Sequence, residues 1–128
     1  MQNQNAKKQN EQTKLLGQKG EAFVVQWLEQ NGFTVLACNY AIKLGEVDII
    51  AGKDDLIVFV EVKTRLKAYF PVSTVVTRSK QQSIIKATRH FVLANRIQNK
   101  VLRFDVATVI YDQNKPQLQY IENAFWAA

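Results

Sequence analysis

One apolar run limits the folds open to this chain more than any other feature. Residues 56–63 read LIVFVEVK, and the first five of them are all apolar. A strand without polar alternation is covered on both faces, so this run predicts a central strand of a sheet. Residues 46–51 (EVDIIA) predict the preceding strand, and the polar residues 52–55 (GKDD) predict the turn between the two.

The rest of the chain predicts two helices and three further strands. Apolar residues at helical spacing predict a first helix over 13–31, ended by Gly32, and a second over 78–98, with Thr77 as its N-cap. Strands are predicted over 33–39, 101–111 and 117–124. This order predicts an α/β fold, in which a mixed sheet of about five strands is flanked by two helices.

Length and composition fit a single domain. The chain has 128 residues, of which 47% are hydrophobic, enough to close one core. Residues 1–11 carry almost nothing apolar and predict a disordered polar tail, which leaves 12–128 as the domain. The lone Cys38 excludes an internal disulfide. Because the sequence has neither a membrane-length apolar span nor a secretion signal, we expect a cytoplasmic protein.

The charge of the chain is distributed unevenly. The net charge is +6, and the stretch between Val62 and Phe104 has ten basic residues and no acidic one. This block indicates an anionic partner such as nucleic acid, although a charge run is also typical of an ordinary solvated face. The expected nucleic-acid contacts are Arg65, Lys67, Arg78, Lys86, Arg89 and Arg96.

Strand geometry predicts that acidic and basic side chains meet on the central hairpin. Residues two apart on a strand share a face, so Glu61 and Lys63 point the same way. A two-residue turn pairs residues whose numbers sum to 109, and a four-residue turn gives 107. Either register brings Asp48 opposite or diagonal to Glu61 on the same face.

Carboxylates that converge on a mostly apolar strand are costly as bare charges. A hard divalent cation removes this cost, because Mg²⁺ prefers oxygen ligands, and it can then activate water and neutralise a phosphoryl oxygen. The alternative is a buried Glu–Lys ion pair that serves only the fold. Three further residues are aimed at the same place: Glu46 on the strand of Asp48, Glu21 on the apolar side of the first helix, and Lys80 on the sheet-facing stripe of the second.

Four motifs in order resemble the YraN family of small bacterial proteins. They are GQKGE at 17–21, GEVDIIA at 45–51, FVEVKTR at 59–65 and RFD at 103–105. The resemblance implies a restriction-endonuclease-like fold with an αβββαβ core and relatives among archaeal Holliday junction resolvases. It implies metal ligation by Asp48 and Glu61, a catalytic role for Lys63, an additional acidic ligand in Glu21 and an accessory basic position at Lys80. Because the resolvase relatives dimerise, it also implies a homodimer.

These observations predict a Mg²⁺- or Mn²⁺-dependent endonuclease that hydrolyses phosphodiester bonds in DNA, including branched or structured DNA. Two other hypotheses stay open. The first is a non-catalytic nucleic-acid-binding protein that retains the nuclease fold, and the second is an interaction module in which the acids are structural. Phe125 and Trp126 either stack on bases or contribute to packing and partner contacts.

Overall fold

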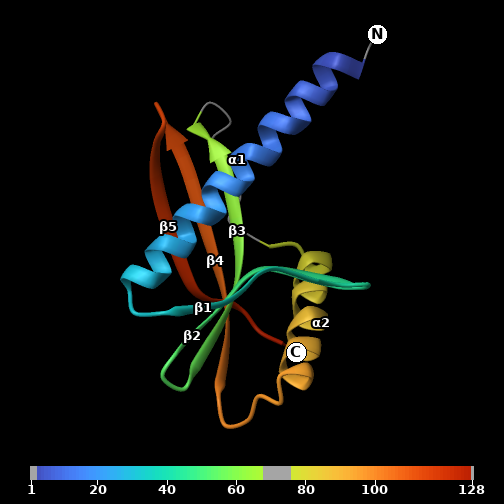
Figure 1. The fold of residues 1–128 in the computed structure, drawn as a ribbon, viewed down its shortest axis with the longest axis vertical. Helices are drawn as coiled ribbons and strands as arrows, with labels where there is room; N and C mark the ends of the chain where they lie inside the picture. Colours follow the sequence, from blue (N-terminus) through green and yellow to red (C-terminus); the bar gives the residue numbers. More distant parts are fainter. Residues whose placement is uncertain (1–2, 68–75, 128) are drawn as a thin grey trace.

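The computed structural model describes residues 3–67 and 76–127. In this part of the chain, two helices and five strands follow one another in the predicted order (Figure 1). Their bounds are α1 Asn3–Gln30, β1 Thr34–Ile42, β2 Gly45–Lys53, β3 Leu56–Leu66, α2 Arg78–Ala94, β4 Val101–Asp112 and β5 Lys115–Phe125. The predicted α/β class is confirmed, and the arrangement is consistent with a restriction-endonuclease-like core.

The five strands form one mixed sheet in the order β1-β2-β3-β4-β5. Neighbouring strands are antiparallel except β3 and β4, which are parallel and are joined through α2. A parallel pair needs such a crossover, because a short turn cannot reverse the chain to start a strand at the same end. Topology therefore places α2 across the sheet next to β3.

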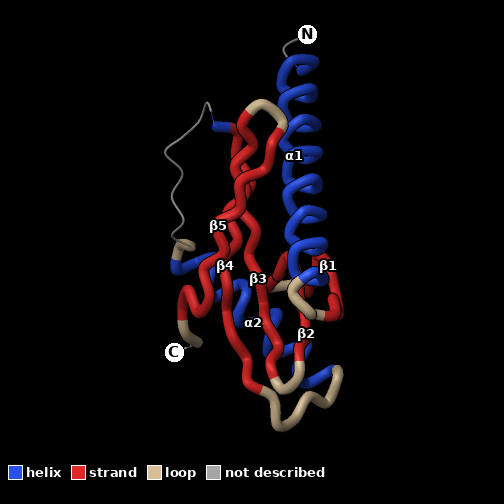
Figure 2. The backbone as a smooth tube through the Cα atoms, turned by 90° about the vertical axis from the view of Figure 1, so that its left-hand side faces the viewer, coloured by secondary structure: helices blue, strands red, loops and turns tan. Residues whose placement is uncertain are grey.

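The apolar run on β3 lies at the centre of the sheet, as predicted. Ile57, Val58, Phe59 and Val60 are all buried. Figure 2 shows α1 and α2 on opposite faces of the sheet, and two separate clusters of side chains fill the layers. Val58 and Val60 pack towards α1, whereas Ile57 and Phe59 pack towards α2. The two-sided covering explains why this strand has no polar alternation.

The first helix is longer than the sequence pattern predicts. The tail predicted over residues 1–11 is wrong for residues 3–11, which form the first turns of α1. Residues 4–14 are exposed, so this part of the helix has no apolar periodicity from which it could be predicted. Gln, Lys, Ala and Glu are nevertheless good helix formers, and they continue a helix whose later turns are packed. In the described part of the chain, neither helix has a stretch long and apolar enough to cross a bilayer.

The second helix is shorter than predicted. It ends at Ala94, where the N–H of Asn95 donates to the carbonyl of Phe91, and Arg96 then takes a positive φ of 51°. A left-handed residue stops helical hydrogen bonding, so the apolar Ile97 packs from a loop instead of from the helix. At the other end the predicted N-cap is confirmed, because Thr77 Oγ1 accepts a hydrogen bond from the Lys80 N–H.

The β2 strand belongs to the sheet in its second half and lies against α2 in its first. Backbone pairing with β3 runs from Lys53↔Leu56 back to Ile49↔Val60. Before Ile49 the strand keeps its pairing with β1, and this hairpin reaches across to α2 (Figure 1). There the N–H of Glu46 donates to Ser83 Oγ over 3.1 Å.

The contact between β2 and α2 depends on Gly45 having no side chain. A Cβ at this position would lie 2.3 Å from the Ser83 carbonyl oxygen and 3.0 Å from the Ala87 nitrogen. Both are backbone atoms, so Gly45→Ala must displace the helix, and we expect it to lower the free energy of unfolding by about 1–3 kcal/mol. Urea denaturation measures the change.

Gly17→Ala is the matched control for this prediction. A Cβ on Gly17 would meet no atom within 4 Å. Alanine is the better helix former, so this variant is expected to gain roughly 0.5–1 kcal/mol. Equal stability changes in the two variants would contradict the close approach at Gly45.

Candidate active site

The candidate site lies where β2 separates from β3. The hairpin turns at the two residues Asp54 and Asp55, which selects the register in which paired residue numbers sum to 109. Asp48 is the first residue beyond this ladder, and its Oδ2 accepts a hydrogen bond of 2.8 Å from the Val62 N–H. The Asp48 carboxylate therefore takes the place of a backbone partner and is held beside Glu61, as strand parity predicts.

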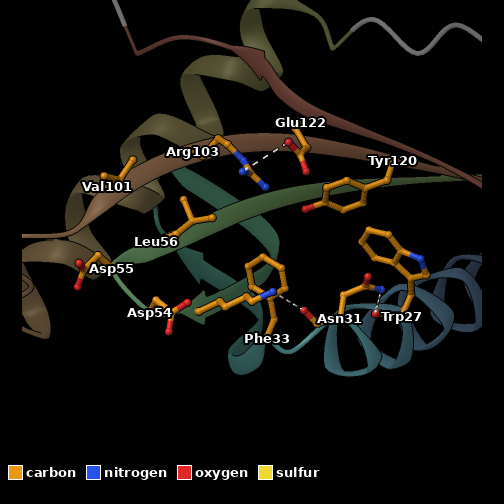
Figure 3. A pocket seen from close by; sticks show the side chains of 11 residues that line it. Trp27, Asn31, Phe33, Asp54, Asp55, Leu56, Val101, Arg103, Tyr120 and Glu122 are labelled. Carbon is orange, nitrogen blue, oxygen red and sulfur yellow. Dashed lines mark hydrogen bonds and ion pairs between the residues drawn. The ribbon is translucent and has the colours of Figure 1, made fainter.

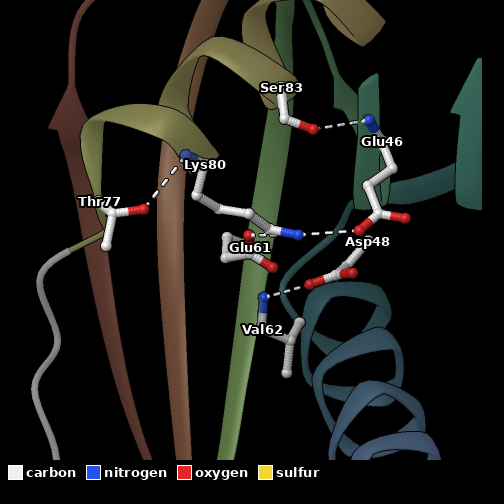
Figure 4. A network of polar contacts seen from close by, with 7 residues as sticks. All are labelled: Glu46, Asp48, Glu61, Val62, Thr77, Lys80 and Ser83. Atoms are coloured by element: carbon white, nitrogen blue, oxygen red, sulfur yellow. Dashed lines mark hydrogen bonds and ion pairs between the residues drawn. The ribbon is translucent and has the colours of Figure 1, made fainter. Parts of the chain in front are cut away.

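Glu61 is an acid held inside the protein. Its side chain is 8% exposed, and its Oε2 atom has no hydrogen-bond partner among the residues that the structure describes. Lys80 lies close to it, with its Nζ 3.6 Å from Glu61 Oε2 and 2.9 Å from Glu46 Oε1 (Figure 4). Lys80 comes from the first turn of α2, where the Thr77 cap fixes the start of the helix. Helix α2 thus supplies the Lys80 ammonium group that contacts Glu46 on β2 and Glu61 on β3.

Burial and neighbouring charges change the protonation of these groups. Burial, followed by a hydrogen bond with Asp48 and the like charge of Asp48, raises the pKa of Glu61 to about 9, although Lys80 acts to lower it. Burial lowers the pKa of Lys63, and Arg65 lowers it too, against the opposing effect of Glu61. Burial also acts to lower the pKa of Lys80, but its hydrogen bond to Glu46 and the nearby acids raise it overall.

Glu21 approaches the same junction from α1. It is half-buried, and burial raises its pKa, followed by the charge of Asp48. A hydrogen bond with Asn39 on β1 lowers the pKa, and the more distant charge of Glu46 raises it. The sequence prediction that Glu21 and Asp48 approach each other is thus met by the fold.

A pocket of about 320 Å³ opens on the α2 side of Glu61. It is lined by Glu61, Val62, Lys63, Arg65, Val76, Thr77 and Lys80. One buried acid and three cations therefore surround this space, and the backbone N–H of Val62, another of its lining residues, donates to Asp48. Such a pocket can accept an anion, since its cations outnumber its acid.

The donor atoms at the junction fit a hard divalent cation. Asp48 and Glu61 offer carboxylate oxygens, and in the part of the chain that the structure describes the buried Oε2 of Glu61 has no hydrogen-bond partner, the Lys80 Nζ lying 3.6 Å away. Mg²⁺ is commonly held by one or two carboxylates together with waters. Within residues 3–67 and 76–127, however, no three His, Cys, Asp or Glu side chains stand close enough together to hold a metal ion.

The predicted nucleic-acid contacts divide into separate groups. Arg65 lines the pocket of Glu61, and Lys67 pairs with Asp112 over 3.1 Å. Arg78, Lys86 and Arg96 are exposed on or just after α2. Arg89 lines a different pocket, on the side of α2 away from Lys80. The six residues therefore do not form one surface around the acids.

Two residues that position the acids are not found from the sequence. Ser83 holds the Glu46 backbone, and its spacing of three residues from Lys80 on the same helix is a signal that could have found it. Asn39 contacts Glu21 and lies opposite Asp48 between the pairs Cys38↔Ile49 and Tyr40↔Val47. This register follows an irregularity between Val35 and Ala37, which the sequence does not reveal.

The motif at residues 103–105 has a structural role away from the acids. Asp105 is fully buried and accepts hydrogen bonds from Arg103 Nε and Nη2, at 2.9 and 3.0 Å, and from the Tyr120 hydroxyl. It also accepts the Asn123 N–H where pairing of β4 with β5 is irregular. Arg103, Tyr120 and Trp27 line a pocket of about 570 Å³ (Figure 3), in which Arg103 is committed to Asp105 and Glu122.

The raised pKa of Glu61 predicts how stability depends on pH. The folded protein holds a proton on Glu61 that the unfolded chain, with a pKa near 4.5, releases. This contribution is full below pH 4.5 and is lost as pH rises to about 9, so stability in a chelator should fall by on the order of a few kcal/mol. Urea denaturation between pH 5 and 9 measures it.

Glu61→Gln supplies the comparison, because glutamine is neutral at every pH. Its unfolding curve should be nearly independent of pH over the same window, whereas the exposed control Glu29→Gln should follow the parent protein. A parent protein whose stability rises with pH would contradict a protonated Glu61.

Comparison with known proteins identifies relatives along most of the chain. Residues 20–109 match the model of a family described as "Uncharacterised protein family UPF0102". A UPF0102 protein of Alkaliphilus metalliredigens is 42% identical over 114 residues, covering 88% of this chain and 99% of the relative. A UPF0102 protein of Alkaliphilus oremlandii is 43% identical, and one of Dictyoglomus thermophilum 39%, each over 115 residues, 88% of this chain and 98% of the relative. The resemblance is thereby confirmed, and the chain belongs to the UPF0102 (YraN) family.

Proposed function

We propose that this protein is a Mg²⁺- or Mn²⁺-dependent endonuclease that hydrolyses phosphodiester bonds in DNA. One observation carries the proposal: the paired acids Asp48 and Glu61 are held together where two strands separate, beside the cationic pocket of Lys63, Arg65 and Lys80. Two carboxyl groups held this close cost free energy once both ionise, and a site that keeps them together is typical of cation binding and catalysis.

The roles follow from the position of each group. Asp48 and Glu61 would hold the cation, with Glu21 and Glu46 as acids further out. When bound, a divalent cation supplies neutralisation of a phosphoryl oxygen and a more acidic bound water. Lys63 carries a labile proton because its pKa is lowered, so it suits proton transfer or stabilisation of charge at the reacting phosphate. Arg65 and Lys80 would bind flanking phosphates.

The experiment that tests this function measures strand cleavage directly. Plasmid, single-stranded and four-way-junction DNA, with matched RNA, are each incubated with the purified protein and Mg²⁺, Mn²⁺ or chelator. Cleavage of DNA that requires a metal supports the proposal, and preference for the junction would identify branched DNA as the substrate. Absence of cleavage with every substrate and metal would reject the enzyme.

A second function is favoured by the contacts of Lys80. Its ammonium group already lies between Glu46 and Glu61, where it neutralises acids without a metal. Together with the absence of a three-ligand cluster among the described residues, this favours a nucleic-acid-binding protein that retains the nuclease fold without cleaving. Binding would then weaken with salt and be indifferent to divalent cations.

Calorimetric titration of Mn²⁺ separates the two functions. For the enzyme, we expect one site per chain that is lost in Asp48→Asn, and an affinity that rises from pH 6 to pH 8 because Glu61 must release its proton. Asp55→Asn, in an exposed acid of the hairpin turn, is the control and should bind like the parent protein. A parent protein with no heat of Mn²⁺ binding at either pH would favour the second function.

A further inference from the structure

A second pocket lies on the side of α2 away from the acids. It has a volume of about 620 Å³ and is formed by α2, the start of β4 and the residues that end β5. Phe104 and Phe125 line it as a stacked pair with ring centroids 5.0 Å apart, and both belong to the core. Ile85, Val92 and Leu102 complete its apolar lining. None of the residues assigned to the acidic site lines this pocket.

Two large apolar side chains at the pocket are open to solvent. Leu93 is 78% exposed and Trp126 is 72% exposed, although both line the pocket. Phe125 is buried, so it fixes the backbone that carries Trp126 at this rim. Apolar groups gathered around a hollow, rather than scattered singly, are typical of a surface that binds a partner.

The charge at this pocket has one sign. Among the described residues that line it, Arg89 is the charged one and none is acidic. Arg78 precedes Arg89 by eleven residues, about three helical turns, so both lie on the stripe of α2 that also carries Ile85 and Val92. The pocket thus combines an apolar interior with the cation of Arg89, and Arg78 adds a second cation beyond the pocket on the same stripe of the helix.

We propose that this pocket binds an acidic peptide segment of a partner protein, with an aromatic or aliphatic side chain inserted between Phe104 and Val92. Acidic groups of the segment would lie against Arg89 and Arg78. A second copy of this chain is disfavoured, because its net charge of +6 would bring like charges together. Nucleic acid is disfavoured, because aliphatic side chains such as Ile85 and Leu102 offer base edges no hydrogen bonds.

Four labelled peptides test the proposal by fluorescence anisotropy. Each peptide has four charged residues, either all Asp or all Lys, followed by two C-terminal residues that are either Leu-Phe or Ser-Ser. We expect the Asp peptide ending in Leu-Phe to bind about tenfold or more tightly than each of the other three, and to weaken with salt. Equal binding of all four, or binding of none, would overturn the proposal.

Substitutions assign binding to the pocket. Arg89→Glu and Leu93→Ser should each weaken the acidic peptide by about tenfold, since both side chains are exposed and can be changed without disturbing the core. Lys86→Glu makes the same charge change on α2 outside the pocket, and Leu15→Ser removes an exposed leucine from α1. Both controls should bind like the parent protein.

Other occupants give results of their own. Sedimentation that shows self-association in the parent protein but not in Leu93→Ser would assign the pocket to a second copy and overturn the acidic segment. Displacement of the peptide by a single-stranded oligonucleotide, with oligonucleotide binding lost in Arg89→Glu, would assign it to nucleic acid. The peptide assay needs no divalent metal, so its outcome is independent of cleavage at Asp48.

Discussion

Asp48→Asn is expected to lower the rate of DNA cleavage by roughly 10³-fold or more, the upper end of what losing one charge-stabilising group costs. The amide keeps the size of the side chain and an oxygen that can accept the Val62 N–H, so the junction of β2 and β3 is preserved. What disappears is one negative charge beside Glu61, and with it the attraction for a divalent cation. Single-turnover cleavage at saturating protein measures the loss.

Lys63→Met should lower the rate of DNA cleavage by a comparable factor, because it removes a cation of the site rather than an acid. Methionine keeps the length of the side chain but has no proton to donate and no charge to place beside a phosphate. Mn²⁺ binding should persist in Lys63→Met and be lost in Asp48→Asn, which separates a chemical role from a ligand role. Asp55→Asn changes an exposed residue of a hairpin turn and Lys115→Met the exposed first residue of β5, and both should cleave at the parent rate.

Cleavage that survives in both Asp48→Asn and Lys63→Met would contradict the proposed enzyme. The same result would also show that the activity belongs to a contaminating nuclease, since both variants remove groups at the junction. Circular dichroism and urea denaturation on each preparation establish that lost activity does not come from lost structure.

Asp105→Ala is expected to lower the free energy of unfolding by about 3–5 kcal/mol, the usual cost of removing one partner from a buried ion pair. Between the pairs Phe104↔Phe125 and Val106↔Ile121, β5 has three residues opposite the single residue Asp105. Its carboxylate satisfies the Asn123 N–H at this irregularity and holds Arg103 by two hydrogen bonds. Alanine removes the acceptor that these donors share.

A surface pair on the same strand is the control for Asp105. Asp112 forms an ion pair with Lys67, but the Lys67 side chain is 64% exposed, so Asp112→Ala should change stability by less than about 1 kcal/mol. The double variant Arg103→Met with Asp105→Leu should lose less than Asp105→Ala alone, because no charge is left buried without its partner. Equal losses of stability for Asp105→Ala and Asp112→Ala would contradict a stabilising role of the buried Asp105 carboxylate.

The parts of the fold that a pattern of burial determines could be predicted from sequence. Alternation and its absence on β3 gave the central strand, and parity alone placed Asp48, Glu61 and Lys63 on one face whichever turn closed the hairpin. The same reasoning failed for residues 3–11, because a fully exposed helix has no apolar period to detect.

Contacts that depend on where a strand stops pairing with its neighbour could not be predicted from the sequence. Lys80 reaches Glu46 because β2 leaves β3 and lies against α2, which is a tertiary event set by Gly45 and Ser83. The pairing of Arg103 with Asp105 likewise occurs where the pairing of β5 is irregular, and no local sequence pattern indicates that irregularity. Charge composition alone likewise does not show that Arg89 lines an apolar pocket.

Because β2 leaves β3 before Asp48, the geometry of the acidic site is separate from the strand pairing that stabilises the sheet. Had the ladder continued through Asp48 and Glu61, the spacing of the two carboxyl groups would be fixed by the strand repeat of about 4.8 Å. Instead Asp48 is held by the Val62 N–H, on a strand whose first residue lies against α2 at Gly45. If the acids hold a cation as we propose, a small shift of this helix would change which cation they prefer, Mg²⁺ at 2.0–2.1 Å or a larger ion, without any change to the central strands. Selectivity would then diverge among relatives that share an unaltered core.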